Sequence, residues 1–142
     1  MAIQSYRDLE VWRRSMELAK TVYVLTKSFP REETYGLSSQ MRRAAVSIPS
    51  NIAEGQGRLS TGEFLNQLSV SRGSLMELQT QIILAQELDY VESSKSKLAL
   101  DATYLVAKLL NGLLRSLLRR SSENKNPANR GRSVNFKPNT NP

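Results

Sequence analysis

The most restrictive feature of this sequence is a run of mostly apolar positions at alternating spacings of four and three residues. It comprises Phe64, Leu68, Ser71, Leu75, Leu78, Ile82 and Ala85. This spacing places every member on one face of an α-helix, because the helix turns once every 3.6 residues. The preceding stretch STGE can form a capping box, in which the Ser60 hydroxyl and the Glu63 carboxylate each accept from the other's backbone amide. We therefore expect a long helix after Ser60.

Three further segments have helical periodicity. Residues 9–29 carry two adjacent columns, Val11, Leu18, Val22, Leu25 and Phe29 beside Trp12, Met16, Ala19 and Tyr23, before the breaker Pro30. From about Thr34 the column is Leu37, Met41, Ala44, Ala45, Ile48 and Ile52, and the last column, ending near Arg120, is Leu98, Ala102, Leu105, Leu109, Leu113 and Leu117. Strand signals are absent from the sequence. We predict an all-α protein, an antiparallel up-down-up-down four-helix bundle over residues 1–120.

The stretch SIPSNIAEGQGR, residues 47–58, ends the second expected helix. A proline inside a helix removes one backbone hydrogen bond, so we expect Ser47 or Ser50, together with a neighbouring helix, to take up the freed carbonyls around Pro49. Asn51 and Glu54 are three residues apart and are expected to tie the end of this helix to its neighbours. Gly55 and Gly57 are expected to form a left-handed C-cap. The third helix offers a matching patch of small and polar residues, namely Ser69, Gly73, Ser74 and Glu77.

Composition excludes much catalytic chemistry. The chain has 142 residues, no Cys and no His, which removes thiolate nucleophiles, imidazole bases, zinc sites of Cys and His, and disulfides. Its 13 acidic residues show no ligand spacing typical of a calcium or magnesium loop. We expect no metal site and no cofactor. Neither a signal peptide nor a stretch of about 20 apolar residues is visible, so we expect a cytoplasmic protein without a membrane contact.

The charge is strongly positive, at a formal net value of +7. Such a chain attracts polyanions through its summed electrostatic field. Residues 121–142 contain 4 Lys and Arg against 1 Asp or Glu, and they are rich in Asn, Ser and Pro. Their only large apolar side chains are Val134 and Phe136, so we expect a disordered basic tail.

Three stretches together resemble a known family. They are YRDLEVWRRSMELAKTVYVLT, SSQMRRAAVSIPSNIAEGQGR and EFLNQLSVSRGSLMELQTQIILAQELDY. They resemble the four-helix-bundle proteins encoded within intervening sequences of bacterial 23S ribosomal RNA genes, over roughly residues 6–118. The family pattern maps onto Arg42, Arg43, Ala44, Ser47, Ile48, Pro49, Asn51, Ile52, Glu54 and Gly55, and onto Gly73, Ser74, Leu75 and Glu77. The departures are Ser71-Arg72, where many members have a small apolar residue, and Asp89-Tyr90, where they usually have Gly-Tyr.

The resemblance implies an antiparallel four-helix bundle that associates into a ring, typically a homopentamer. It extends to the accessory variability protein of diversity-generating retroelements, whose basic five-fold barrel binds nucleic acid and the reverse transcriptase of the element. Most stand-alone members have no established activity. The resemblance therefore implies the fold and, as a possible partner, a reverse transcriptase.

Our first hypothesis is an oligomeric scaffold that binds RNA or DNA without sequence specificity. The candidate binding residues are basic side chains of the first, second and fourth helices, namely Arg13, Arg14, Lys20, Lys27, Arg42, Arg43, Arg115, Arg119 and Arg120. A symmetric ring would repeat each such patch in every subunit. Solvation alone is the competing interpretation, because pairs such as Glu10 and Arg14 partly neutralise the first helix. Trp12 and Tyr23 are expected in the core, which leaves no aromatic platform for bases.

Two other hypotheses stay open. A protein-interaction adaptor is favoured by a second stripe on the last helix, Val106, Leu110, Leu114 and Leu118, which exceeds what one face of a small bundle needs. An enzyme would depend on Asn51, Glu54 and Glu77 being polar groups near the core. No base or oxyanion hole accompanies them, so we expect these residues to be structural and the protein not to be an enzyme.

Overall fold

The structure is a computed structural model that describes residues 5–125. Within this range it is all-α and has no strand. Four long helices follow one another: α1 (Glu10–Thr26), α2 (Leu37–Gln56), α3 (Thr61–Glu87) and α4 (Ser93–Lys125). Two short 3-10 helices, η1 (Tyr6–Asp8) and η2 (Arg31–Glu33), precede α1 and α2. The predicted fold class of four helices and no strands is confirmed for this range.

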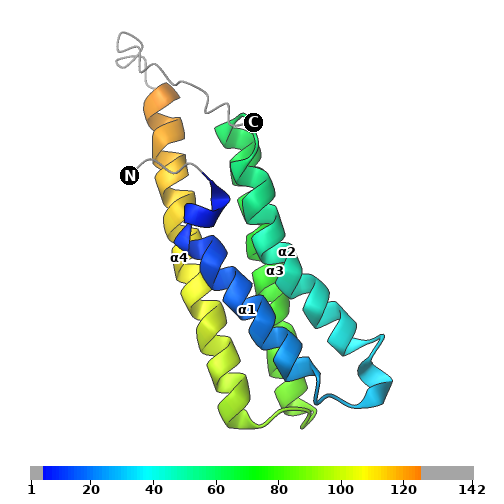
Figure 1. Cartoon of the computed structure of the whole chain (residues 1–142). Helices are drawn as coiled ribbons and strands as arrows, with labels where there is room; N and C mark the ends of the chain where they lie inside the picture. The colour runs from blue at the N-terminus through cyan, green and yellow to red at the C-terminus, as the bar shows by residue number, and fades with distance from the viewer. Residues whose placement is uncertain (1–4, 126–142) are drawn as a thin grey trace.

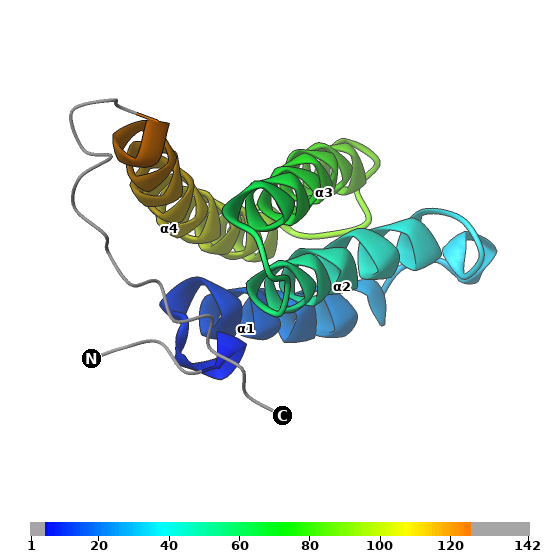
Figure 2. The ribbon, with the colours of Figure 1, turned by 90° about the horizontal axis from the view of Figure 1, so that it is seen from above.

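The four helices pack around one core, and the most extensive contact joins α2 to α3 (Figures 1 and 2). Each helix contacts the next one along the chain, and α1 also contacts α4. Seen from above, α1 and α2 lie together on one side, with α3 and α4 on the other (Figure 2). The α1–α2 and α3–α4 connections lie at the same end of the molecule, and the α2–α3 connection lies at the opposite end (Figure 1).

Local chemistry explains where the helices begin. Ser60 precedes α3, and its hydroxyl accepts from the backbone N–H of Glu63 at 3.1 Å, as the STGE stretch predicts. At the start of α2, the Glu33 carboxylate accepts from the N–H of Leu37 at 2.8 Å and from the hydroxyl of Tyr90 at 3.3 Å. Burial and the adjacent Glu33 raise the pKa of Tyr90 above its ordinary value of 10.0. This pair joins the α3–α4 turn to the start of α2.

The core columns of α2 and α3 are those that the periodicity predicts. Met41, Ala45, Ile48 and Ile52 of α2 are fully buried, as are Leu68, Leu75, Leu78, Ile82 and Ala85 of α3. Even the polar member, Ser71, is fully buried. The periodicity therefore predicts correctly which side of α2 and of α3 faces the core.

The predicted core column of α4 is only partly correct: Leu117 is buried, and Ala102, Leu109 and Leu113 are partly buried against the core. Leu98 is 70% exposed and Leu105 is 40% exposed, because they lie on the flank of α4. The buried column is Ser96, Ala99, Thr103, Val106, Leu110 and Leu117. Val106 and Leu110, which the sequence analysis assigned to a surplus stripe, are thus core residues, whereas Leu118 is exposed. The helix also continues to Lys125, five residues beyond Arg120.

The expectation that Trp12 and Tyr23 lie in the core is also corrected. Tyr23 is 42% exposed and Met16 is 37% exposed, while Trp12 is partly buried against the core. The helix α1 ends at Thr26, three residues before Phe29. Within residues 5–125, no helix is long and apolar enough to cross a membrane. The predicted disordered tail lies, from residue 126 onward, outside the described residues.

Candidate nucleic-acid interface

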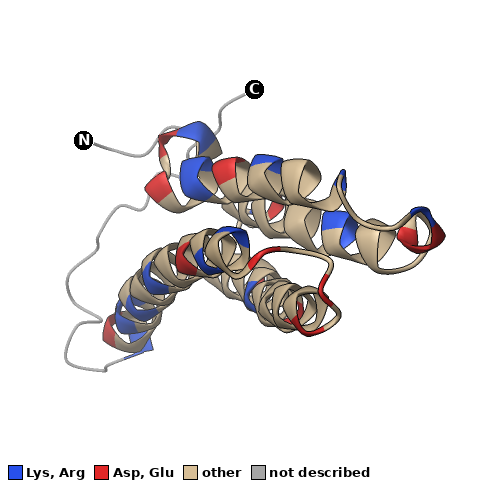
Figure 3. Ribbon diagram, turned by 90° about the horizontal axis from the view of Figure 1, so that it is seen from below, with Lys and Arg blue, Asp and Glu red and all other residues tan. Residues whose placement is uncertain are grey.

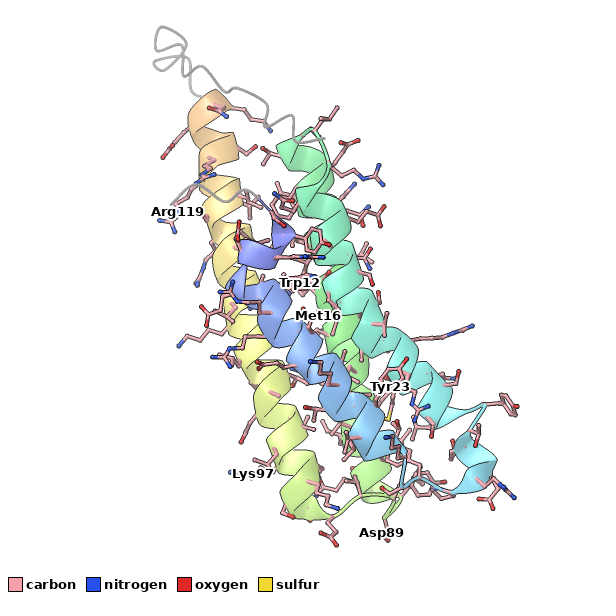
Figure 4. The ribbon with its side chains drawn as sticks, in the orientation of Figure 1. Trp12, Met16, Tyr23, Asp89, Lys97 and Arg119 are labelled. Carbon is pink, nitrogen blue, oxygen red and sulfur yellow. The ribbon has the colours of Figure 1, made fainter. Side chains whose placement is uncertain are left out.

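One side of α4 carries a straight row of exposed cations around a tyrosine. We call Lys97, Tyr104, Lys108, Arg115 and Arg119 the α4 stripe, and all five are exposed. Their spacings of 7, 4, 7 and 4 residues keep them on one side of the helix. At a rise of about 1.5 Å per residue, the row from Lys97 to Arg119 is roughly 33 Å long. Figure 4 labels these two end residues.

The cations of the α4 stripe are largely unneutralised. Asp101 pairs with Lys97 at 3.9 Å, and Glu123, one turn after Arg119, forms no ion pair with it. Among residues 5–125, no carboxylate forms an ion pair with Lys108, Arg115 or Arg119. Three adjacent positive side chains without counter-charges are suited to a row of phosphates, since each can replace condensed counterions.

The surplus positive charge of the described chain belongs to α1 and α4. Residues 5–30 and 90–125 contain 12 Lys and Arg against 6 Asp and Glu, a difference of +6. Residues 31–89 contain 5 against 7, a difference of −2. Lys and Arg follow one another along α4 in the view from below (Figure 3). The molecule therefore has a basic half and a weakly acidic half.

The structure uses the predicted cations of α1 in different ways. Arg13 donates to the carbonyl of Arg7 at 3.0 Å. Arg14 lies between two carboxylates, 3.8 Å from Glu10 and 3.3 Å from Glu17, so its charge is compensated. Lys20 and Lys27 are exposed, and together with Lys95 they surround a groove of about 610 Å³ between α1 and α4. Val24 and Leu98 form part of its apolar lining.

The adjacent arginines of α2 differ. The Nε atom of Arg42 donates to the Thr26 hydroxyl at 2.9 Å, and its guanidinium lies 4.7 Å from the centre of the Tyr23 ring. Arg42 is therefore engaged in the α1–α2 contact and is a poor candidate for binding a phosphate. Arg43 is exposed. On α4, Arg120 is exposed but lies about 100° around the helix from Arg119, outside the α4 stripe.

A groove between α1 and α2 was missed by the sequence analysis. It has a volume of about 940 Å³, and its lining includes Trp12, Met16, Tyr23, Val46 and Pro49. In Figure 4 the labelled side chains of α1 lie beside α2 along this groove. The sequence does contain the signal, because Trp12, Met16, Ala19 and Tyr23 form the second column of α1. That column was interpreted as core, although only part of it is covered.

The SIPSN segment is tied to α3 by hydroxyl groups. The hydroxyls of Ser47 and Ser74 lie 2.9 Å apart, and the buried Ser71 hydroxyl donates to the carbonyl of Ile48 at 2.9 Å. Asn51 donates to the carbonyl of Ser47 at 2.7 Å, and Ser50 donates to that of Val46 at 2.7 Å. Three successive carbonyls around the buried Pro49 thus receive side-chain donors. Ser50 and the neighbouring helix do supply donors next to Pro49, and the Ser47 hydroxyl contacts Asn51 and Ser74. The carbonyl that the proline frees is that of Ala45, four residues earlier, and these donors reach its neighbours Val46, Ser47 and Ile48 instead.

The prediction that Gly55 and Gly57 form a left-handed C-cap is wrong. Gly55 lies inside α2 and is buried, and a Cβ atom there would be 2.8 Å from both Gln67 Cβ and Phe64 Cδ2. Gly57 ends α2 with a φ of −77°, so neither residue forms a left-handed cap. Gly73 is exposed, and a Cβ there would meet nothing within 4 Å. Gly55, and not Gly73, therefore permits the close approach of α2 and α3.

The two acidic candidates are outside the core. Glu54 is exposed and pairs with Arg58 one turn further along the chain. Glu77 is exposed and accepts from the Gln81 side-chain amide at 3.2 Å. The described part of the chain contains no group of three or more Asp and Glu side chains placed to hold a metal ion. The expectation that Asn51 and Glu54 tie α2 to neighbouring helices is corrected, since Asn51 donates to Ser47 of α2 and Glu54 pairs with Arg58 on the same segment.

Comparison with known proteins agrees with this architecture. A crystal structure from Bacteroides thetaiotaomicron, described as a protein with unknown function from the S23 ribosomal protein family, superposes with a TM-score of 0.69. The two chains are 24% identical, and the match covers 74% of this chain and 95% of the other, which shows a shared fold. No curated protein matches the sequence. The sequence profile of the 23S rRNA-intervening sequence proteins matches residues 7–112, so the chain belongs to this family.

Proposed function

We propose that this protein is a non-enzymatic, self-associating scaffold that binds nucleic acid without sequence specificity. The α4 stripe is the proposed contact surface. The observation that carries the proposal is the row of unpaired cations Lys108, Arg115 and Arg119 on one side of α4. Contacts of this kind act on phosphates and sugars, which explains the absence of sequence preference that we propose.

Self-association would multiply this surface. We propose that the helices run up-down-up-down and that the bundles assemble into a ring, a pentamer by family resemblance. Exposed apolar side chains on α1, α3 and α4 support an assembly, since a monomer would leave them in water. Five copies would place five α4 stripes on one particle and raise its local field.

The proposal includes two further elements that come from the resemblance. A reverse transcriptase-like protein is proposed as a partner of the assembly, and the cytoplasm is proposed as its location. We propose no catalytic role. Glu54 and Glu77 are exposed and hydrogen-bonded to neighbours on their own helical segment, which supports structural or solvating roles for both.

Fluorescence anisotropy of labelled RNA and DNA duplexes across a salt series tests the binding site. The variant Lys108→Gln/Arg115→Gln/Arg119→Gln should bind more weakly, and the slope of log K against log salt should fall by about 3. Matched neutral replacements at Arg14, Arg42 and Arg58 should change the slope little, because all three side chains have partners within the protein. A chain ending at Lys125 separates the contribution of the tail.

Equal binding by the stripe variant and the wild type would overturn the proposed site. Binding that does not depend on salt would contradict the electrostatic mechanism altogether. Binding lost on removal of the tail would move the contact to residues 126–142.

A second candidate function is a protein-interaction adaptor without a nucleic-acid role. The α1–α2 groove favours it, because a concave surface with Trp12, Met16, Tyr23 and Val46 has the composition typical of protein interfaces. If the assembled protein bound no nucleic acid at any salt concentration, the adaptor function would be favoured over the nucleic-acid scaffold.

A further inference from the structure

The outer side of α1 combines cations with exposed apolar side chains. Lys20 and Lys27 are exposed, one heptad apart, and form no ion pair with a described carboxylate. Between them lie Tyr23 and Val24, and Val24 is 68% exposed. We call Arg13, Met16, Lys20, Tyr23, Val24 and Lys27 the α1 face. Lys20 also lines the 940 Å³ groove, so this basic surface borders the largest hollow described above.

The outer side of α3 has the opposite charge. Its outward row consists of Glu63, Val70, Glu77, Leu84 and Leu88, which we call the α3 face, and all five side chains are exposed. The one basic residue of α3 is Arg72, and it lies on a different side of the helix, about 160° around the axis from Val70. Val70 is 52% exposed, so an apolar surface lies between two carboxylates that have no described ion-pair partner.

The two faces have the same charge spacing. Arg13 and Lys27 are 14 residues apart on α1, and Glu63 and Glu77 are 14 residues apart on α3. At about 1.5 Å per residue, both pairs are separated by roughly 21 Å along their helices. Each face carries apolar side chains between its charges. A single docking geometry can therefore align the charges while the apolar side chains leave water.

The two faces cannot meet within one molecule. Figure 2 shows α1 and α3 on opposite pairs of helices, with their outer sides directed away from each other. We infer that the acidic α3 face of one copy docks on the basic α1 face of the next copy, along the border of the α1–α2 groove. This inference rests on the self-association in the proposed function and specifies its interface. Because two different surfaces pair, the contact is heterologous and repeats head to tail, and it closes into a ring where the rotation permits.

This assignment divides the basic residues between two tasks. The α1 face would hold the assembly together, and the α4 stripe would remain free for nucleic acid. The two tasks can then be abolished separately.

The experiment uses two full-length charge-reversal variants, Arg13→Glu/Lys27→Glu and Glu63→Lys/Glu77→Lys. Light scattering coupled to size exclusion gives the mass of each variant and of their equimolar mixture. Each variant alone should dissociate at concentrations more than about tenfold above those that dissociate the wild type, because like charges oppose each other at the contact. The mixture should associate again, since unlike variants present complementary faces to each other. A closed ring of five subunits would still contain one contact between like variants, so the expected product is an assembly larger than either variant alone and not the full wild-type mass. Circular dichroism checks that both variants remain helical.

A matched control carries the same change of charge on another face. Arg115→Glu/Arg119→Glu should keep the wild-type mass and lose nucleic-acid binding. Reversal variants that assemble like the wild type, or a mixture that stays dissociated, would overturn the inferred interface while the ring itself stands. A wild-type protein that is monomeric at all concentrations would overturn self-association, and with it this interface.

Discussion

The two sides of α2 show how differently one helix can be used. The side toward α3 is closely packed. The Ser47 hydroxyl bonds the Ser74 hydroxyl, and the Ser71 hydroxyl donates to the Ile48 carbonyl. Gly55 has no Cβ, which leaves room for the Phe64 ring. The side toward α1 is open along much of its length, where Val46 borders a groove of about 940 Å³. Small residues line the close contact between α2 and α3, whereas large side chains line the open groove between α1 and α2.

The two sides of α2 therefore have different roles: the side toward α3 stabilises the subunit, and the side toward α1 is available to a partner. Hydroxyl pairs and a buried glycine give the α2–α3 contact its specificity, because the hydroxyls of Ser47, Ser71 and Ser74 find partners inside the protein. The α1–α2 side instead leaves aromatic and apolar surface accessible. Substitutions on the closely packed side should therefore change the stability of each subunit, whereas those on the open side should act on partners.

The largest effect is expected for Gly55→Ala. The new Cβ would lie 2.8 Å from Gln67 Cβ and from Phe64 Cδ2, so the helices must separate. We expect the free energy of unfolding to fall by about 1 to 3 kcal/mol, as for other overpacked sites. Denaturant unfolding followed by circular dichroism measures it.

Gly57→Ala is the matched control for that substitution. A Cβ at Gly57 would lie 3.6 Å from the nearest atoms, and the φ of −77° suits any residue. Gly57→Ala should be neutral or slightly stabilising, because alanine has the higher helix propensity. Equal losses of stability for the two variants would contradict close packing as the cause of the effect at Gly55.

A smaller loss is expected for Ser71→Ala. The variant removes a buried hydroxyl that donates to Ile48 beside Pro49, which should cost about 1 kcal/mol. Ser69→Ala, on the exposed side of α3, should be nearly neutral in the same unfolding experiment. A neutral Ser71→Ala would mean that the proline tolerates the loss of the cross-helix donor.

The contrast between α3 and α4 shows what periodicity can predict. The α3 column repeats without interruption at spacings of four and three residues, and this regularity predicts its orientation correctly although Val70, Met76 and Ile83 are exposed on its other sides. In α4, Leu and Ala occupy several sides, and the true core column contains Ser96 and Thr103. These polar residues are buried because they bond Gln86 and Gln79 of α3, at 2.6 Å and 3.1 Å, which a hydrophobicity pattern cannot anticipate.

The candidate site was predictable in its residue types but not in its pairings. The sequence identifies Arg14, Arg42 and Arg115 equally well as cations. Only the packing reveals that Arg14 lies between two carboxylates and that Arg42 bonds Thr26, while Arg115 has no described ion pair. The exposed Tyr104 was overlooked because its position has meaning only once the outer side of α4 is known.

One departure from the family pattern does have a structural explanation. Asp89, where relatives usually have Gly, has a φ of 60°, in the left-handed region that favours glycine. The N–H of Asp89 donates to the Gln86 carbonyl, and the N–H of Tyr90 donates to the Ala85 carbonyl. These two hydrogen bonds end α3 with a Schellman motif. The turn is thus kept by an aspartate, one of the residues that tolerate this conformation best.

Gly73→Ala should act in the opposite direction to Gly55→Ala. Gly73 is exposed within α3 and a Cβ there meets nothing within 4 Å, so alanine should stabilise the subunit by roughly 0.5 to 1 kcal/mol through helix propensity. Unfolding at protein concentrations low enough to give monomers measures this gain. A loss of stability in the monomer would contradict the open surroundings of Gly73.

The smallest effect is expected for Glu54→Ala. Its ion pair with Arg58 is exposed, with about half of each side chain accessible, and such pairs contribute about 0.5 kcal/mol or less. The sequence analysis placed this carboxylate near the core, where a larger loss would be expected. Denaturant unfolding at two protein concentrations distinguishes the possibilities. A loss that appears only at the higher concentration would assign Glu54 a cation on a neighbouring subunit, whereas a large loss at both would contradict its exposed position.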